Sequence, residues 1–432
     1  MISRPLGSKP QYLPIFHDTY LHEALGYRHM VRENLSRRTV LKGIGAAGMV
    51  SVAGCTGGES GATIGMANSN TGSLSTFGQR NKRGKQIALD DINETGVLGG
   101  DLEIIEEDTQ SESGPGVSAA QKLVNQDGVP LLIGAVSSGV SLAIYKSVIQ
   151  GSDVTQISQN STSPDLTNFP DLLRMSPTGA AQASALAGIV NEDGHGKVAV
   201  THLTNAYGVG VAEAFDEAYG GESKLFPHDQ GKSSYSNVIT SMADYDADAW
   251  LFVTYQPEFT TMAQESYDSG NSGEVALYGS DSVKGPNVLE QTPEGSLEGM
   301  KLVAPSAALD QDNYKQFAQA FRDNHDTEPT AWSAYAYDAV VTAAIAIEAA
   351  GSTDPAEIKA EARGVTGPGG TEVFTFAEAV EALGDDGSAS DVNYQGVSGP
   401  IDLDKNGDPK AFEQIFQIQD GEYVSQGFIA GE

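Results

Sequence analysis

Apolar and polar positions along most of the chain alternate in the manner of strands followed by helices. Short continuous apolar runs predict buried strands, and the longer amphipathic segments between them predict helices. The expected strands occupy residues 63–68, 102–108, 130–136, 154–159, 197–203, 223–229, 249–255 and 274–280. The expected helices occupy residues 77–96, 117–128, 141–151, 180–194, 207–221, 235–247, 257–270, 313–325 and 331–351. This alternation predicts an α/β fold.

The pattern is interrupted after the strand at 154–159 and restarts with the helix at 180–194. Two successive cycles of similar size predict two doubly wound, Rossmann-like lobes. In open α/β sheets, ligands bind beyond the carboxyl ends of the strands. The loops of interest are therefore those that follow residues 136, 159, 203, 255 and 280.

The end of the chain has the period-two pattern of a hairpin. Residues 399–404 and 411–423 are the predicted strands, and 405–409 is the turn between them. The same text matches a calcium-binding loop in full, with Asp402, Asp404, Asn406 and Glu413 at ligand positions and Gly407 at the turn. Because that loop needs a helix on each side, we interpret the segment as an Asn-Gly turn with solvated acids. A cation site remains the alternative.

The chain is strongly acidic, with 58 Asp and Glu against 25 Lys and Arg in 432 residues. Residues 1–54 contain seven of the basic and three of the acidic residues, which leaves residues 55–432 with 18 basic and 55 acidic ones, a net charge of −37. Nucleic acid is excluded as a partner, because phosphate binding needs a basic face. At molar salt the Debye length is about 3 Å, so the self-repulsion is screened. The acidity therefore predicts a hypersaline, haloarchaeal-like environment.

The first 54 residues have the order of a cleavable export signal. A basic segment ending in Arg37 and Arg38 precedes a short apolar run at 43–53, and small residues precede Cys55. The run is too short to span a bilayer as a stable helix. The segment resembles a twin-arginine signal joined to a lipobox, with Cys55 as the lipid-accepting residue.

Two details of this leader qualify the comparison. Val40 stands where such signals more often have Phe, and a signal that starts at Met30 has the usual length. Residues 1–29 would then be a mis-assigned start, and residues 55–61 form the tether after the lipid anchor. The expected location is the outer face of the cytoplasmic membrane, with membrane contact through the lipid anchor only.

The residues of a metal centre or a catalytic nucleophile are missing from the mature sequence. Its histidines are scattered and no second Cys accompanies Cys55; they are His195, His202, His228 and His325. A nucleophile elbow and a phosphate-binding loop are absent. We therefore expect no cofactor, no metal and no enzymatic activity.

Five segments together resemble the solute-binding proteins of ATP-binding-cassette importers. The closest group is the branched-chain amino-acid (Leu/Ile/Val) type, which has the type I periplasmic-binding-protein fold. The resemblance covers residues 62–432, and the segments that carry it are 64–100, 134–143, 158–167, 205–215 and 392–409. It implies two lobes joined by three hinge crossovers, with a solute held in the cleft between them.

The resemblance also implies how the chain is divided between the lobes. The first lobe would contain residues 62–177 and 306–396, and the second 178–305 and 397–432. The crossovers would fall near 176–179, 304–306 and 395–399.

The site residues follow from matching positions. Ser138, Asn160 and Thr162 match the groups that hold the ligand's α-carboxylate in the family. Small hydroxyls and free N–H groups at strand ends suit an anion, although Ser138 and Thr162 could instead cap helices. Asp281 matches the acid that meets the ammonium group, with Asp in place of the longer Glu.

Aromatic residues complete the expected site. Tyr207 and Tyr255 match family aromatics that wall the pocket, and Phe77 stands where the family often has Tyr. Phe77, Ser73 and Leu74 lie in the region that contacts the ligand's side chain, which is compatible with an aliphatic amino acid.

The expected function is amino-acid binding by hinge closure and delivery to an ABC permease with its ATPase subunits. The alternatives are a binding protein for urea, short-chain amides or a related small polar solute, and a ligand-sensing receptor of the same fold. A hydrolase is disfavoured because the nucleophile and base are missing.

Overall fold

The computed structural model describes residues 61–430 except for residues 272, 274 and 386. The chain divides into two compact units, Met1–Thr56 and Gly57–Glu432, and every described residue belongs to the second. Arg37, Arg38 and Cys55 lie outside the described residues. Among the helices that are described, none combines the length and the apolar character of a membrane span.

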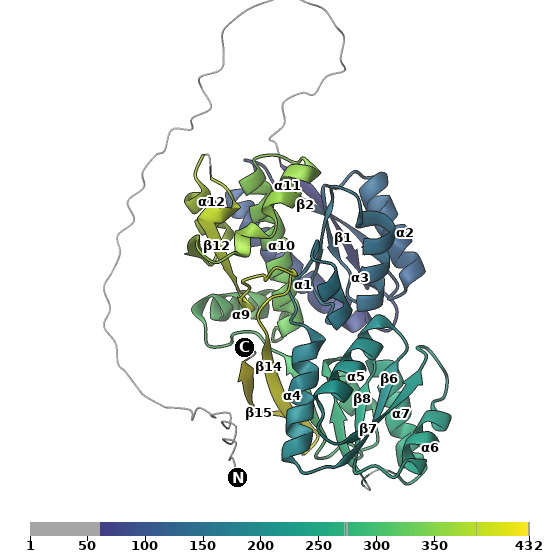
Figure 1. The fold of residues 1–432 in the computed structure, drawn as a ribbon. Helices are drawn as coiled ribbons and strands as arrows, with labels where there is room; N and C mark the ends of the chain where they lie inside the picture. The colour runs from purple at the N-terminus through teal and green to yellow at the C-terminus, as the bar shows by residue number, and fades with distance from the viewer. Residues whose placement is uncertain (1–60, 272, 274, 386, 431–432) are drawn as a thin grey trace, which may run out of the picture. The chain divides into compact units, whose positions relative to one another are not determined.

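The second unit contains two α/β lobes, each built around a sheet of its own (Figure 1). In the first lobe, five parallel strands have the order β2-β1-β3-β4-β5. These strands are β1 (Ala62–Asn68), β2 (Leu102–Asp108), β3 (Leu131–Gly134), β4 (Thr155–Ser158) and β5 (Leu172–Arg174). The helices between them are α1 (Ser75–Thr95), α2 (Ser113–Asn125) and α3 (Ser138–Ile144), the last continued by a π-helical turn at Tyr145–Ile149. The predicted doubly wound α/β fold is confirmed.

A later helix, α10 (Ala331–Ala350), completes the first lobe by packing against α1. All residues from Trp332 to Ile347 are buried, which suits a helix that is apolar on every side. Gly84 of α1 allows the close approach, since a Cβ there would stand 2.0 Å from the carbonyl oxygen of Ser333. The pairing brings Phe77 and Trp332 together, with ring centroids 5.3 Å apart.

Several smaller elements were not expected from the sequence. A small sheet contains three strands, β11 (Thr371–Val373), β12 (Val392–Gly396) and β13 (Gly399–Pro400). Beside it are α9 (Asp312–His325), which was expected, and α11 (Pro355–Glu361) and α12 (Phe376–Leu383), which were not. Short 3-10 turns occur at Pro164–Asn168, Asp281–Val283, Gly364–Thr366 and Ala389–Asp391.

The second lobe contains a seven-stranded sheet in the order β15-β14-β10-β9-β8-β6-β7. Its strands are β6 (Lys197–Leu203), β7 (Glu222–His228), β8 (Ala249–Val253), β9 (Ala276–Gly279), β10 (Lys301–Pro305), β14 (Phe412–Gln419) and β15 (Glu422–Ala430). The last two are antiparallel to their neighbours. The sequence patterns did not predict β10, although it joins the parallel and antiparallel parts of this sheet.

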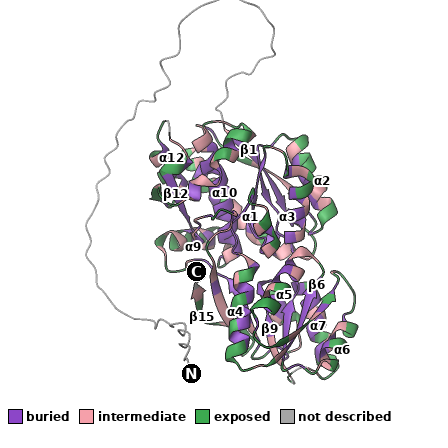
Figure 2. Ribbon diagram, in the orientation of Figure 1, coloured by how far each residue is buried: buried purple, intermediate pink, exposed green. Residues whose placement is uncertain are grey.

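Helices cover both faces of the second sheet, and each face has its own apolar core. On one face are α4 (Gly179–Glu192) and α5 (Ala206–Ala218), which share a core with Val200 and Val303. On the other are α6 (Ser236–Asp244), α7 (Gln256–Asp268) and α8 (Pro286–Gln291), packed with Trp250 and Phe252. Figure 2 shows the resulting pattern of buried strands and helices with exposed outer sides.

The chain passes between the two main sheets three times. It crosses between Arg174 and Gly179, returns after Pro305, and crosses again between Pro400 and Phe412. The last crossing lies later than expected, because residues 401–410 stay on the first lobe.

The contacts of Arg174 give the physical reason for the late crossing. Its backbone N–H donates to the carbonyl of Gly407 at 3.1 Å, and its guanidinium Nε lies 2.6 Å from Asp408 Oδ1. The expected start of the second lobe at residue 397 was therefore too early.

The expected C-terminal hairpin was also wrong in its pairing. Residues 404–408 do form a turn, in which Asp404 Oδ1 accepts from the backbone N–H groups of Asn406 at 2.8 Å and Asp408 at 3.0 Å. However, β14 pairs with β15 and β10 rather than with residues 399–404. Glu413 lies inside this sheet, away from the turn, and no cluster of three or more metal-ligating side chains occurs among the described residues.

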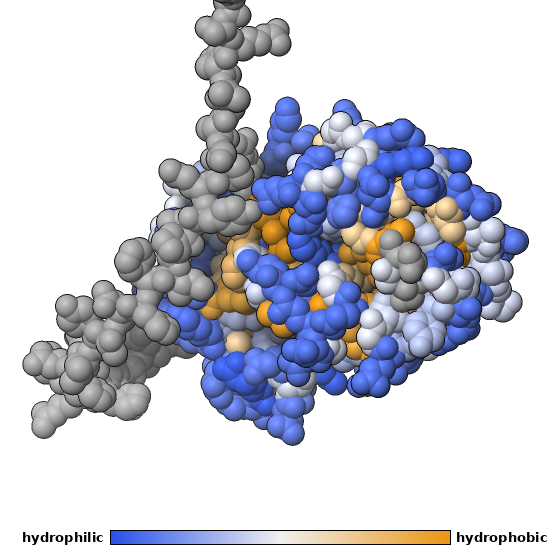
Figure 3. Space-filling model, turned by 90° about the horizontal axis from the view of Figure 1, so that it is seen from below, coloured by the Kyte–Doolittle hydropathy of each residue, from blue (hydrophilic) through white to orange (hydrophobic). Residues whose placement is uncertain are grey.

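The surface of the molecule is predominantly hydrophilic. In the view from below, hydrophilic residues cover most of the face and hydrophobic ones show in patches between them (Figure 3). The large apolar side chains that are exposed are Tyr267, Leu309, Phe374 and Phe428. Tyr267 belongs to α7 and Phe428 to β15, whereas Leu309 and Phe374 lie outside the helices and strands.

Candidate ligand-binding site

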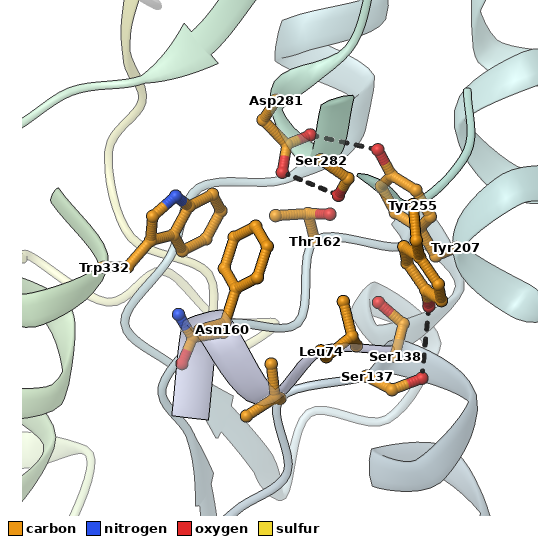
Figure 4. A pocket seen from close by; sticks show the side chains of 12 residues that line it. Leu74, Ser137, Ser138, Asn160, Thr162, Tyr207, Tyr255, Asp281, Ser282 and Trp332 are labelled. Carbon is orange, nitrogen blue, oxygen red and sulfur yellow. Dashed lines mark hydrogen bonds between the residues drawn. The ribbon is translucent and has the colours of Figure 1, made fainter. Parts of the chain in front are cut away.

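A small cavity lies between the two lobes at the carboxyl ends of their strands. Twelve residues line it: Leu74, Phe77, Val136, Ser137, Ser138, Asn160, Thr162, Tyr207, Tyr255, Asp281, Ser282 and Trp332. Figure 4 shows their side chains converging on it from both lobes. All seven candidate residues from the sequence, and Leu74, are thus brought together.

Four further lining residues were missed by the sequence patterns, and one expected residue is absent. Ser137 and Ser282 are direct neighbours of the predicted residues, whereas Val136 and Trp332 gave no such signal. Trp332 begins an Ala-rich helix, so its pattern was that of a core residue. Ser73 does not line the cavity; its hydroxyl accepts a hydrogen bond from the amide of Gln230.

The first-lobe side of the cavity consists of uncharged polar groups at two adjacent strand ends. Ser138 follows β3 and begins α3, and its hydroxyl oxygen accepts from the backbone N–H of Ser163 at 3.1 Å. The hydroxyl hydrogen of Ser138 is then available to a ligand. Thr162 follows β4 in the chain.

Asn160 is the least satisfied group on this side. Its side chain is only 5% exposed, and neither its amide nitrogen nor its amide oxygen has a hydrogen-bond partner in the described protein. Buried amides are nearly always hydrogen-bonded, because leaving one unpaired costs about 1–3 kcal/mol. A polar ligand in the cavity would remove this cost.

The second-lobe side carries one charged group, Asp281. It comes two residues after β9, is 3% exposed, and accepts hydrogen bonds from the Tyr207 hydroxyl at 3.1 Å and the Ser282 hydroxyl at 3.1 Å. Burial raises the pKa of Asp281, and hydrogen bonds from Gln182, Ser282 and Tyr207 oppose that rise. No Lys or Arg among the described residues forms an ion pair with it. Its carboxylate therefore has no cationic counterpart within the described part of the chain.

Two stacked tyrosines form one wall of the cavity. The rings of Tyr207 and Tyr255 are nearly parallel, at 15°, with centroids 5.6 Å apart. Burial raises the pKa of Tyr255 to about 12 and that of Tyr207 well above its ordinary value. Both hydroxyls therefore stay protonated at physiological pH and can donate hydrogen bonds.

One direct contact shows that the lobes are closed on each other. The hydroxyl of Tyr255, in the second lobe, lies 3.3 Å from that of Ser137 in the first. Asn205 Nδ2 also donates to the Tyr255 oxygen at 3.1 Å. On the opposite wall, the T-shaped pair of Phe77 and Trp332 supplies apolar surface.

The chain belongs to the periplasmic binding protein family, whose sequence profile matches residues 61–390. Proteins of this family bind solutes on the extracytoplasmic side. The chain is accordingly a solute-binding protein with the type I periplasmic-binding-protein fold.

Similar proteins agree with this placement. The Leu/Ile/Val-binding protein BraC3 of Rhizobium johnstonii is 29% identical over 308 residues, which cover 69% of this chain and 82% of that protein. The crystal structure of the leucine-binding protein LivK from Thermotoga maritima superposes with a TM-score of 0.74 at 24% identity, over 85% of this chain and 99% of that one. An R. palustris solute-binding protein in complex with benzoate gives 0.70 at 18% identity, over 86% and 97%. The fold is thus shared by proteins whose ligands differ.

Proposed function

We propose that this protein is the solute-binding lipoprotein of an ABC importer and that it binds an amino acid, branched-chain or otherwise aliphatic, in the cavity. The observation that carries the proposal is the polarity of the cavity. One buried carboxylate on the second lobe faces hydroxyls and an unpaired amide on the first. A zwitterion has a charge of each sign, one for each side of the cavity.

Each end of the amino acid would meet groups suited to it. Ser138, Asn160 and Thr162 would hold the α-carboxylate by hydrogen bonds, and Asp281 would pair with the ammonium group in a site shielded from water. Tyr207 and Tyr255 would enclose the backbone of the ligand. The aliphatic side chain would lie against Phe77, Leu74, Val136 and Trp332, which form the apolar part of the lining.

Binding would work by closure of the two lobes about the three crossovers. A ligand that contacts both lobes binds the closed form better than the open one and shifts the population toward it. The contact between Ser137 and Tyr255 belongs to that closed form. The closed form would then dock on the permease, whose ATPase subunits drive import.

Urea or a short-chain amide is the second candidate, favoured by the unpaired Asn160 amide. The similarity to a benzoate-binding protein shows that this fold also accepts an acid without an ammonium group. The negative charge of Asp281 in the cavity opposes such a ligand. A sensing receptor with the same fold would have an equivalent cavity and differ only in its partner.

A thermal-shift panel in molar KCl tests the ligand class. We expect L-leucine, L-isoleucine or L-valine to raise the melting temperature by several degrees, since a ligand at about 100 times its Kd adds about 2.7 kcal/mol to stability. Glycerol at the same concentration is the control for non-specific stabilisation. A response to urea or acetamide and to no amino acid would overturn the proposed ligand class.

The leader and the acidic surface support the proposed location. Arg37 and Arg38 with the apolar run indicate twin-arginine export, and Cys55 would carry the lipid that holds the protein at the membrane. The net charge of −37 in residues 55–432 favours a protein that works in a hypersaline exterior.

Metabolic labelling with a lipid precursor tests the anchor. We expect label in the wild-type protein and none in Cys55→Ser, which should appear in the soluble extracellular fraction. Arg37→Lys/Arg38→Lys should keep the protein inside the cell, as twin-arginine export requires. A Cys55→Ser protein that still carries label would contradict the assignment.

A further inference from the structure

Glu413 is a buried carboxyl group that the fold leaves without hydrogen bonds. It is the second residue of β14, 2% exposed, and neither of its oxygens has a partner in the described protein. A charged carboxylate in such a position is costly, because burial removes its hydration. The group must therefore be neutralised or meet a positive charge.

Asp338 provides an internal comparison. This carboxylate is also fully buried, but it accepts hydrogen bonds from the Tyr394 hydroxyl at 2.8 Å and from the N–H groups of Val397 and Ser398 at 2.9 Å, and from the Ser398 hydroxyl. The fold thus surrounds one buried acid with donors and gives none to the other. Asp338 has the environment of a structural anion, and Glu413 does not.

Glu413 lies beside two of the three crossovers. It follows the third crossover by one residue, and its partner across the sheet, Pro305, ends β10 just before the second. It is on the sheet face covered by α4, where Gln182 donates from Nε2 to the carbonyl of Val303 at 2.9 Å. The other amide atom of Gln182, Oε1, is a further buried acceptor without a partner.

The titratable groups that interact with Glu413 come from two other elements. Asp281 lies in the turn after β9. Its negative charge adds to the larger effect of burial in raising the pKa of Glu413. Tyr335 of α10 donates from its hydroxyl to the carbonyl of Ser306 at 3.1 Å. Burial, and then the negative charges of Glu413 and of Asp338 one turn further along the same helix, raise the pKa of Tyr335. The neighbours on α4, β10 and β15 are Gln182, Pro305 and Ile429, none of which titrates. No positive group balances these acids among the described residues.

We infer that Glu413 is a positioning residue of the ligand site which holds a proton while the cleft is closed and loses it when the cleft opens, so that ligand affinity falls as the pH rises. The inference rests on the proposed hinge closure. Opening would move β14 of the second lobe away from Tyr335 of the first and let water reach the carboxyl group. In the closed form the neutral carboxyl lets Asp281 remain the one negative charge beside the ligand.

The sign of the pH dependence follows from the two states. Burial first, and the charge of Asp281 second, raise the pKa of Glu413 in the closed form well above the ordinary value of 4.5, which water would restore on opening. Closure is therefore fully favoured below the open-state value and is progressively lost as the pH rises toward the closed-state value. Asp281 acts in the opposite sense, because its raised pKa means that protonation at low pH removes the charge that the ammonium needs.

Calorimetric titration of the full chain with L-leucine in molar KCl tests the inference. Above about pH 5, the wild-type Kd should rise with pH by up to tenfold per pH unit, since one pH unit changes the occupancy of one titrating proton tenfold. Parallel titrations in buffers with different ionisation enthalpies should show uptake of close to one proton per ligand. Glu413→Gln, a neutral isostere, should bind with a Kd that no longer rises with pH and take up no proton; exposed Glu217→Gln should behave as wild type.

A second readout needs no ligand. Trp332 lines the cavity, and the only other tryptophan is the buried Trp250, so a Trp250→Phe variant leaves one fluorophore at the site. Its emission should shift to longer wavelength as the pH rises and the cleft opens, and Glu413→Gln should abolish the shift. If L-leucine binds no variant while this shift behaves as expected, the ligand proposal fails and the inference stands.

Three results would overturn the inference. The first is a Glu413→Gln protein whose Kd and fluorescence follow the wild-type pH profile. The second is weaker binding by Glu413→Gln at every pH, which would make Glu413 a charged ligand contact. The third is an affinity that depends on the choice of Na⁺ or K⁺ at fixed pH and ionic strength, which would assign the buried oxygens to a metal cation.

Discussion

Asp281→Asn should raise the Kd for an amino acid by at least about 30-fold. The substitution keeps the shape of the side chain and one acceptor oxygen for the Tyr207 hydroxyl, and its NH2 group replaces the oxygen that accepts from Ser282. It leaves the ligand's ammonium without a countercharge in a site shielded from water. Removing one member of a buried charge pair costs about 2–5 kcal/mol or more, and each 1.4 kcal/mol is a factor of ten. Calorimetry of wild-type and variant chains with the amino acid that responds in the thermal-shift panel measures the change.

The stability of the ligand-free variant separates lost binding from misfolding. Burial disfavours the charged form of Asp281, so a neutral Asn should leave the melting temperature unchanged or raise it. Asp268→Asn, at the exposed end of α7, is the matched control and should bind as wild type. Unchanged affinity in Asp281→Asn would remove Asp281 from the ammonium site.

Asp408→Ala should lower the free energy of unfolding by about 3–5 kcal/mol. The side chain of Arg174 is 0% exposed, and Asp408 is its only carboxylate partner among the described residues. The same carboxylate accepts from the Thr167 hydroxyl at 2.7 Å. Truncating it would leave an uncompensated buried guanidinium, which is the costly half of a buried ion pair. Guanidinium chloride unfolding curves for wild type and variant measure the loss.

A surface pair supplies the control for this prediction. Glu328→Ala breaks the ion pair between Glu328, whose side chain is 73% exposed, and Arg322, whose side chain is 39% exposed. The loss of this pair should lower the free energy of unfolding by no more than about 1 kcal/mol. The double variant Arg174→Met/Asp408→Ala should recover part of the stability, because no buried charge remains unpaired. An Asp408→Ala cost no larger than that of Glu328→Ala would show that the 404–408 turn is not held by this pair.

Secondary structure was best predicted where an apolar run was long and bounded by turn residues. The strands β1, β6 and β8 were placed correctly, since a buried parallel strand is apolar on both faces. The three-residue β5 and the strand β10, Lys301–Pro305, gave no comparable signal. Their existence depends on neighbouring strands that pair with them rather than on their own pattern.

The error at the end of the chain has the same origin. Residues 399–404 alternate like a strand, but Asp404 uses its carboxylate to cap the turn that follows, and Arg174 holds that turn on the first lobe. The calcium-loop spacing is met in sequence, yet it places Glu413 inside a sheet. A spacing rule cannot register which element covers a residue.

Most residues of the candidate site could be predicted from their positions in the chain. Ser138, Asn160, Thr162 and Asp281 each follow a strand, and parallel strands present their carboxyl ends at one edge of a sheet. Their resemblance to family positions then indicated which of many loop residues to choose. The sequence patterns did not indicate Trp332, because it lies at the start of a helix, or Glu413, because it lies within a strand.

The amino-acid sequence is enough to predict the α/β fold class, the two-lobed arrangement and the residues at the strand ends. These features depend on local periodicity and on short-range order along the chain. Three features required the folded structure. They are the late third crossover, the contact between Ser137 and Tyr255 in the closed form, and the burial of Glu413 near Asp281 without a hydrogen-bond donor. Periodicity reports that a side chain is buried, whereas the partners it meets there come from segments more than a hundred residues away.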